Sequence, residues 1–336
     1  MITIHAKEFS AALKAASMAL PSSPLIPIMA YVLVELGQIT AIGTEMSIQI
    51  ATNAEGDESV CVHPGIVQSI VDSLDEPITI TRGRVSWSTG HVDFPPTDGY
   101  PEFVRGNAKR CGTIQGGRYS TILKSGLPVV VEVDMDAKRL VWTDFAAGQV
   151  YFGGHQAFQA YDIEPGGKGN FGMSKSVASK VAGLLSSCEE VGVSESDNQV
   201  YFNSPGLNLA ITKMTDSLPA YARILAKIAE SGYKRTDISI PDLNRIVKSI
   251  RGAFGESIIN VTCAQGMCVV TFTDYNGGKG MSQNIPSGDY LSFHANTKYL
   301  ARNLEVCDTL LFLESESAIY FTGPGVRGLT MPIKML

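Results

Sequence analysis

Apolar residues recur at helical spacing in six stretches of the chain. The clearest stretch is 241–254, where the apolar positions fall on one face of a helix. The residues of this stripe are Leu243, Ile246, Val247, Ile250 and Phe254. Pro241 suits the first turn of such a helix, and Gly255 suits its end. The pattern therefore predicts an amphipathic helix over 241–254.

The other five stretches predict further helices. In the stretch 6–20, the apolar residues on one helix face are Phe9, Leu13, Ala16 and Leu20. In the stretch 174–187, they are Val177, Val181, Leu184 and Leu185. The remaining predicted helices cover 64–74, 118–125 and 296–304. Between the helices, apolar and polar residues alternate with the period of a strand. We therefore predict an α+β fold in which three pairs of helices lie on antiparallel β-sheet.

Three similar segments recur along the chain, and each predicts a strand that enters a turn rich in glycine or proline. The segments are "RVSWSTG" (84–90), "QVYFNSPG" (199–206) and "AIYFTGPG" (318–325). Trp87, Phe202 and Phe321 hold equivalent places in this comparison, about a third of the chain apart. Chains rich in strands also repeat such turns by chance, which is the alternative interpretation.

A second repeat has the same period. The segments "TDGYPEF" (97–103) and "TDSLPAYARIL" (215–225) share the pattern Thr-Asp-x-x-Pro, and their prolines are Pro101 and Pro219. A shared period favours three tandem copies of one unit. We predict that these copies cover 1–108, 109–228 and 229–336.

Charge is distributed unevenly between the predicted helices and the rest of the chain. The helices contain eleven Lys or Arg and three acidic residues, whereas the remainder contains sixteen basic and thirty acidic residues, for a formal net charge of −6. Basic helices in an acidic protein favour a polyanion bound at the helices and repelled elsewhere. Solvated helix faces without a ligand are the alternative. Phosphate contacts carry no sequence information, so the predicted binding is independent of sequence.

Known catalytic and metal-binding motifs are not found in the sequence. There is no HExxH and no G-x-S-x-G, and the histidines are scattered singly, as His5, His63, His91, His155 and His294. Two glycine-rich segments, 166–170 and 277–282, contain a lysine but do not have the GxxxxGK[ST] spacing of a phosphate-binding loop. We predict no catalytic residue, no metal site and no cofactor.

The cysteines and the N-terminal segment predict the compartment. The six cysteines form no CxxC pair, and Cys263 and Cys268 would face opposite ways on a single strand because an odd number separates them. We predict that the cysteines are buried free thiols, with a metal site or a disulfide as the alternative. No stretch approaches the roughly 20 apolar residues of a membrane span, and "MITIHAKEF" does not resemble a signal peptide. We expect a cytoplasmic protein that binds no membrane.

Several segments resemble the bacterial replicative sliding clamp, the β subunit of DNA polymerase III. They are "PSSPLIPIMAYVLVEL" (21–36), "ITAIGTEMSIQI" (39–50), "DSLPAYARIL" (216–225) and "TMPIKML" (330–336). The stretch "TDFAAGQV" departs from the family pattern, because it keeps Thr143 and Asp144 but lacks the glycine and the basic residue expected after them. The chain is also shorter than typical members, mainly because its third predicted helix and the loop that follows it are short, in the segment "GGRYSTILKSGLPVVVEV" (116–133). The sequence is thus similar to a divergent member of that family.

The resemblance implies a three-domain DNA-clamp fold, a head-to-tail homodimer that forms a ring around double-stranded DNA, and a role as processivity factor in DNA replication. The basic residues that we expect to face the DNA are Lys7, Lys14, Lys124, Lys175, Lys180, Arg245, Lys248, Arg251, Lys298 and Arg302, with Arg118 as a further candidate. The resemblance also implies a pocket for short linear motifs of DNA polymerase and clamp loader. The residues that would form it are Thr143, Phe145, Pro219, Arg223, Ile224, Met331, Pro332, Ile333 and Leu336.

Two other classes of function stay open at this stage. One is a structural or carbohydrate-binding protein rich in β-structure, whose helices are merely solvated. The other is an enzyme of an unfamiliar type, which the lack of known motifs makes the weaker alternative. The apolar ending "LTMPIKML" (329–336) has its own alternative, since it could be an edge strand that only completes the last sheet.

Overall fold

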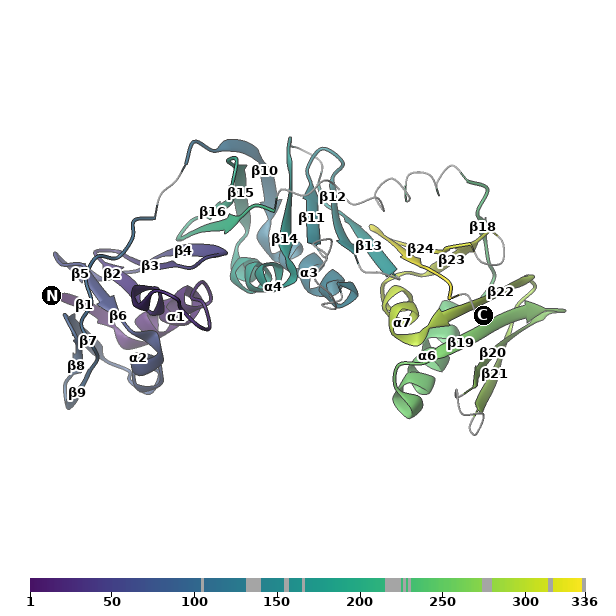
Figure 1. The fold of residues 1–336 in the computed structure, drawn as a ribbon, viewed down its shortest axis with the longest axis horizontal. Helices are drawn as coiled ribbons and strands as arrows, with labels where there is room; N and C mark the ends of the chain where they lie inside the picture. The colour runs from purple at the N-terminus through teal and green to yellow at the C-terminus, as the bar shows by residue number, and fades with distance from the viewer. Residues whose placement is uncertain are drawn as a thin grey trace. The chain divides into compact units, whose positions relative to one another are not determined.

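The computed structural model describes residues 1–103, 106–130, 140–153, 157–164, 167–214, 225, 228, 231–273, 280–313 and 317–333. Contacts within the chain divide it into two compact units. The first unit contains Met1–Thr121 and Gly166–Thr215, and the second contains Ile122–Pro165 and Asp216–Leu336. Figure 1 shows the elements of both. The division does not follow the three predicted copies, because the middle third contributes to both units.

The first unit contains two sheets. Its helices are α1 (Ala6–Ser17), η1 (Pro27–Ala30), α2 (Pro64–Val71), α4 (Lys175–Leu184) and η3 (Leu185–Ser187). The five-stranded sheet has the order β5-β1-β7-β8-β9 and the eight-stranded sheet the order β10-β15-β16-β17-β4-β3-β2-β6. The strands of the first third are β1 (Ile2–His5), β2 (Val32–Glu35), β3 (Gln38–Ile42), β4 (Met46–Ala51), β5 (Glu55–Gly56), β6 (Val60–Val62), β7 (Pro77–Thr81), β8 (Arg84–Trp87) and β9 (Gly90–Asp93). The other strands of these sheets are β10 (Lys109–Gln115), β15 (Glu190–Glu195), β16 (Gln199–Ser204) and β17 (Leu207–Thr212). Strand β14 (Asn170–Ser174) belongs to neither of these two sheets.

The eight-stranded sheet joins segments that are far apart in the sequence. Strand β17 pairs antiparallel with β4, and Leu207 lies opposite Ile50 while Ile211 lies opposite Met46. The sheet is therefore continuous across the predicted boundary at residue 108. Helices α1 and α2 contact each other, and Phe9 and Leu13 on α1 are fully buried.

The second unit repeats this plan. Its helices are α6 (Ile240–Phe254), α7 (Thr297–Val306) and η2 (Leu127–Val129), and α3 (Gly116–Gly126) spans the division between the units. One sheet contains, in order, β11 (Leu140–Asp144), β12 (Gln149–Gly153), β13 (Ala157–Asp162), β25 (Val326–Thr330), β24 (Ile319–Gly323), β23 (Thr309–Phe312) and β18 (Lys234–Arg235). The four-stranded sheet contains, in order, β21 (Gly280–Pro286), β20 (Met267–Thr273), β19 (Ile258–Ala264) and β22 (Leu291–Asn296). Strand β25 pairs antiparallel with β13, which places Val326 opposite Tyr161.

Helix α6 forms where the sequence predicts a helix. The Ser239 side chain caps it by accepting a hydrogen bond from the Asp242 backbone N–H. The helix ends at Gly255, whose φ of +75° is easily adopted only by glycine. Four residues of the predicted stripe are buried, but Phe254 is 37% exposed and its ring lies 4.6 Å from that of Phe272. The end of the stripe therefore packs against β20 near the surface instead of entering the core.

The other predicted helices are also present, with shifted ends. Helix α1 ends at Ser17 and not at residue 20, so the half-buried Leu20 lies beyond it. Helix α3 is longer than the predicted stretch 118–125, and the Ser120 hydroxyl on α3 donates a hydrogen bond to the Ala182 carbonyl on α4. This bond connects the two helices of the middle third.

The hairpin register corrects one detail of the predicted repeat. The closing pairs of the three hairpins are Trp87 with Gly90, Ser204 with Leu207, and Gly323 with Val326. Counted from these pairs, Val85 and not Trp87 is equivalent to Phe202 and Phe321. All three equivalent side chains are fully buried, whereas Trp87 at the end of its strand is half-buried.

A disulfide joins Cys263 and Cys268, which contradicts the prediction of free thiols at these positions. The two cysteines lie on neighbouring strands, β19 and β20, and not on one strand. Gln265 and Gly266 both have positive φ and form the tight turn between these strands. The turn places the cysteines directly opposite each other, where side chains point to the same face. The free cysteines are Cys61, Cys111, Cys188 and Cys307.

Candidate functional site

The basic residues of α1 point away from the core. Phe9 and Leu13 bury one face of this helix, so the opposite face carries Lys7 and Lys14, whose side chains are 66% and 60% exposed. Both amines contact carboxylates. Lys7 Nζ lies 2.5 Å from an oxygen of Asp75, and Lys14 Nζ lies 2.9 Å from an oxygen of Asp72.

These two carboxylates stay ionised. A hydrogen bond from Ser10 and a second from Lys14 lower the pKa of Asp72, and a hydrogen bond from Lys7 lowers the pKa of Asp75. Asp75 lies beyond the ends of the predicted helices, so the helix charge count did not include it. The net positive charge of this face is therefore smaller than the sequence suggests.

Helices α6 and α7 form a second basic region in the other unit. The carboxylate of Glu305 on α7 forms two ion pairs. Its Oε1 lies 3.2 Å from Lys248 Nζ on α6, and its Oε2 lies 3.2 Å from Arg302 Nη1 on the same helix. Lys298 Nζ lies 2.7 Å from Glu256. These side chains are partly exposed, and ion pairs at the surface contribute roughly 0 to 1 kcal/mol. A phosphate group can therefore replace the carboxylate at little cost.

Arg245 completes the set of paired bases. Its guanidinium lies 3.0 Å from Asp242, one turn away on α6. The Ser239 hydroxyl and then Arg245 lower the pKa of Asp242, so the pair is ionised at neutral pH. Six of the ten Lys and Arg side chains predicted to face DNA thus contact an acidic side chain.

The other predicted DNA-facing bases have no ion pair with any residue that the structure describes. They are Lys124, Lys175, Lys180 and Arg251. Lys175 and Lys180 both lie on α4, whose apolar face is buried through Val177 and Val181. The solvent-facing side of α4 therefore carries unneutralised positive charge, as do Lys124 on α3 and Arg251 on α6.

The placement of lysines in first turns was not anticipated from the sequence. Lys175 is the first residue of α4, after the capping Ser174, and Lys298 is the second residue of α7, after the capping Asn296. Neither first turn contains an acid. A cation at a helix N-terminus opposes the helix dipole, but together the two attract anions. These helix ends are therefore suited to bind phosphate. Helix stability does not explain why lysines occupy the first turns.

The predicted peptide pocket is only partly within the described residues. Pro219, Arg223, Ile224 and Leu336 lie outside them. Thr143 and Phe145 are buried, at 0% and 1% exposure, on and just after β11. Met331 is 44% exposed, and Pro332 and Ile333 are half-buried. The pocket therefore stays a prediction.

The described part of the tail does not form the edge strand that the alternative required. Strand β25 ends at Thr330 and lies between β13 and β24, so it is an interior strand. Beyond Pro332, the Ile333 backbone N–H donates a hydrogen bond to the His294 carbonyl at 2.8 Å. Met331 and Ile333 thus leave the sheet and lie on the surface of the second unit.

Trp142 was not singled out in the sequence and lies beside Thr143 on β11. It is 3% exposed, and its indole N–H has no hydrogen-bond acceptor among the described residues. Buried indole N–H groups usually have a partner. The side chains of Trp142 and Thr143 point to opposite faces of the strand, so Trp142 is a buried aromatic residue beside Thr143 in sequence and does not face the same side.

The described residues contain no candidate for a membrane span or a metal site. No described helix is both long and apolar enough to cross a membrane. No group of three or more His, Cys, Asp or Glu side chains in the described ranges could hold a metal ion. The basic helix faces and the tail region are therefore the candidate sites.

The fold is similar to that of bacterial sliding clamps along the whole chain. A protein assigned as a DNA polymerase III beta subunit, from Eubacterium rectale, has a TM-score of 0.87 at 10% identity, and 99% of each chain is covered. Caulobacter crescentus pol III beta has a TM-score of 0.86 at 14% identity, over 99% of this chain and all of the other. The beta subunit from the DNA polymerase of Streptococcus pyogenes has a TM-score of 0.85 at 13% identity, with the same coverage.

Sequence comparisons give no match. No protein-family model matches the chain, and no curated protein matches its sequence. The predicted resemblance is thus confirmed as a shared α+β fold, with a sequence that has diverged far from these clamps.

Proposed function

We propose that this chain is a non-enzymatic DNA sliding clamp that encircles double-stranded DNA and tethers a replicative polymerase in the cytoplasm. The observation that carries the proposal is the similarity of fold to DNA polymerase III beta subunits over 99% of the chain. The Lys and Arg side chains on α1, α4, α6 and α7 support it, because they gather at helix surfaces in a protein of net charge −6. They are paired with carboxylates that a phosphate can replace or, as on α4, have no ion-pair partner among the described residues. A tether raises the effective concentration of the polymerase at the primer end without a chemical step.

We place three clamp domains at 1–108, 109–228 and 229–336. The strand pairing supports this division. Strand β17 of the middle third pairs with β4 of the first, and β25 of the last third pairs with β13 of the middle one. In each case the last strand of a repeated hairpin adds to the edge of the preceding copy.

The same rule leaves two edges without a partner. Strand β9 is the equivalent of β17 and β25 in the first third, and it forms the end of its sheet. Strand β21 is the equivalent of β4 and β13 in the last third, and it also forms the end of its sheet. Unpaired edges of this kind are usually covered. We infer that β9 of one chain pairs with β21 of a second chain, as a head-to-tail ring requires.

The two internal junctions predict the register of this contact. Asn208 on β17 lies opposite Gln49, and Arg327 on β25 lies opposite Ala160. Both are the second residue after their hairpin turn, and their counterpart on β9 is His91.

The position on the edge strand follows from the strand beside it. Gln49 lies opposite the third residue of β3, and Ala160 lies opposite the third residue of β12. The residue of β21 that meets the same condition is Asn284, opposite Val269, so we expect His91 of one chain to lie opposite Asn284 of the next.

The polymerase and the clamp loader would bind the pocket around the tail through short linear motifs. Met331, Pro332 and Ile333 leave the sheet beside β22. Thr143 on β11 and Phe145 just after it are buried and would form the wall of the pocket. A concave apolar site with a few polar groups suits a short peptide with a Leu or Phe anchor.

Retention on DNA tests the proposal directly. The full chain is loaded onto nicked circular DNA with a bacterial clamp loader and passed through a sizing column in high salt. We expect the protein to stay on the circle and to leave once the circle is cut, because a ring is held by topology. A protein that only contacts phosphates would instead lose affinity with a log-log salt slope of about −0.9 per contact. Equal loss from circular and linear DNA would reject the ring.

A further inference from the structure

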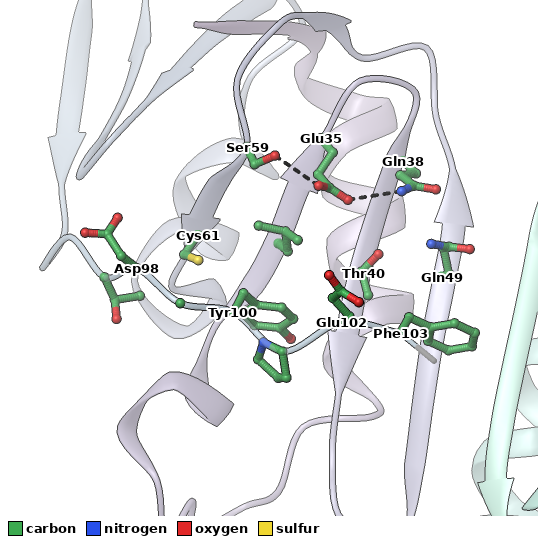
Figure 2. A pocket seen from close by; sticks show the side chains of 14 residues that line it. Glu35, Gln38, Thr40, Gln49, Ser59, Cys61, Asp98, Tyr100, Glu102 and Phe103 are labelled. Carbon is green, nitrogen blue, oxygen red and sulfur yellow. Dashed lines mark hydrogen bonds between the residues drawn. The ribbon is translucent and has the colours of Figure 1, made fainter. Parts of the chain in front are cut away.

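A cavity in the first unit lies between one face of a sheet and a segment that crosses it. Residues 97–103 run across β2, β3 and β4 and leave a cavity of about 550 Å³, shown in Figure 2. Tyr100 fixes the crossing segment, because its hydroxyl accepts a hydrogen bond from Ile42 N and donates one to the Tyr31 carbonyl, each at 3.0 Å. The cavity is therefore built into the fold.

Its lining is acidic. Glu35, Asp98 and Glu102 line the cavity, and its described lining residues include no basic side chain. Asp98 pairs with Arg82, which neutralises that carboxylate. Burial and then the charges of Asp98 and Glu35 raise the pKa of the Cys61 thiol to about 11. Glu35 and Glu102 are left as negative groups without a described cationic partner.

Glu35 is held in position by two neutral donors. The Ser59 hydroxyl donates to Oε1 at 2.9 Å, and the Gln38 amide donates to Oε2 at 3.0 Å. Figure 2 shows these two bonds. Neutral donors orient a carboxylate but do not cancel its charge. The group is therefore fixed and still able to bind a cation.

The floor of the cavity carries a hydroxyl that has no partner. Thr40 on β3 is 3% exposed and lines the cavity, and its Oγ1 has no hydrogen-bond partner among the residues that the structure describes. Buried side-chain hydroxyls nearly always have a partner, so an unpaired one in a native fold calls for an unseen group. Figure 2 labels Thr40 among the side chains that line the cavity with Glu102. A donor or acceptor that enters the cavity beside Thr40 would supply this partner.

We propose that this cavity binds an ammonium group at the end of an aliphatic chain. Glu35 and Glu102 supply the compensating charge, and Thr40 Oγ1 accepts one N–H. The apolar surface of Leu33, Tyr100 and Phe103, which also line the cavity, packs against the methylene groups. A lysine side chain of a partner protein and a free polyamine share this chemistry. The site is separate from the basic helix faces and does not depend on the proposed clamp function.

Titration calorimetry on the full chain tests the site with two probes. One is 1,5-diaminopentane, and the other is the capped tripeptide acetyl-Ala-Lys-Ala-amide. Their uncharged counterparts are 1-pentanol and the same peptide with norleucine in place of lysine. We expect a charged probe to bind and its uncharged counterpart not to bind. Binding of the diamine alone identifies a free polyamine as the ligand, and binding of the lysine peptide identifies a partner protein.

Three variants separate the site from general charge effects. Glu35→Gln and Thr40→Val should each weaken binding about tenfold or more, as expected for the loss of a hydrogen bond to a charged group. Thr40→Val should not lower the melting temperature, because it removes a hydroxyl that has no partner. Glu45→Gln makes the same charge change on an exposed loop and should leave affinity unchanged. Equal affinity in all three variants, or no binding at millimolar probe, would overturn the proposal.

Discussion

The carboxamides of Gln159 and Asn303 meet inside the second unit, with 3.1 Å between Gln159 Nε2 and Asn303 Oδ1. Both residues are 0% exposed. The Gln159 amide also donates to the Arg302 carbonyl at 3.0 Å, and the Asn303 amide donates to the Thr330 hydroxyl at 2.8 Å. This network ties α7 to β13 and β25, across one of the two junctions between predicted copies.

Replacing Gln159 with methionine should destabilise the protein measurably. The methionine side chain has a similar shape but leaves Asn303 and the Arg302 carbonyl without their partner, at a cost of about 1–3 kcal/mol. Denaturant unfolding followed by circular dichroism measures this change. Gln149→Met, which removes one hydrogen bond from a half-buried side chain, is the matched control and should cost less. Equal effects of the two substitutions would show that the buried network adds no stability.

A pair of cysteines at His91 and Asn284 should link two chains head to tail. In the proposed register these positions lie opposite each other, where the Cα atoms of antiparallel strands are close enough for a disulfide. Mild oxidation of the double variant should give covalent dimers on a non-reducing gel. Each single variant should stay largely monomeric on that gel. If the double variant also forms no dimer, the register or the interface is wrong.

Lysines on α4 should contribute to direct DNA contact. Lys175→Ala and Lys180→Ala should each lower the log-log salt slope of DNA binding by about 0.9, measured by fluorescence anisotropy with a short duplex. Lys234→Ala removes an exposed charge from β18, outside the helices, and should leave the slope unchanged. Retention of the loaded ring on circular DNA should not change in any of these variants. An unchanged slope in both α4 variants would exclude this helix face from DNA contact.

Removing Met335 and Leu336 should abolish binding of a polymerase-derived peptide. Burial of an apolar side chain in a pocket contributes roughly 1.5–3 kcal/mol, so the loss of two such contacts should weaken binding strongly. The melting temperature should barely move, because the last strand ends at Thr330. Anisotropy with a labelled peptide and a thermal melt report the two properties separately. Unfolding of the truncated chain, or unchanged peptide affinity, would contradict this role of the tail.

The disulfide between Cys263 and Cys268 should be detectable by counting thiols. Alkylation of the unfolded, non-reduced protein should label the four free cysteines, and prior reduction should raise the count to all six. Mass spectrometry distinguishes these products. Reduction should lower stability by about 2 kcal/mol, the entropy expected for a short closed loop. Six labelled cysteines without reduction would show that the pair is not oxidised.

The sequence predicted the features that depend on local spacing. The apolar stripe of α6 was correct for Leu243 to Ile250 because neighbours on one helix face are set by the chain itself. The prediction that Phe254 is buried with this stripe was wrong, because its contact is made by Phe272 on another element. The disulfide was missed because an odd spacing excludes a pair only on a single strand. Gln265 and Gly266 turn the chain between the two cysteines.

Long-range partners were the other limit. The bases of the candidate DNA interface were found from the helix pattern, but Asp75 and Glu256, which pair with Lys7 and Lys298, come from outside the helices. The sequence gives no sign that the Thr40 hydroxyl lacks a hydrogen-bond partner, because whether a buried group is hydrogen-bonded depends on all of its neighbours in the fold. Such contacts become visible only when the whole fold is known.

The antiparallel pairing of β17 with β4 also bears on how such a chain can be inherited. Without β17, β4 would present a row of unpaired backbone groups between Met46 and Ile50, and an exposed edge of this kind promotes aggregation. A gene fragment that encodes the first third alone would therefore yield an aggregation-prone protein. Exchange of segments between relatives has to carry both strands together, or replace them with a pair that still matches.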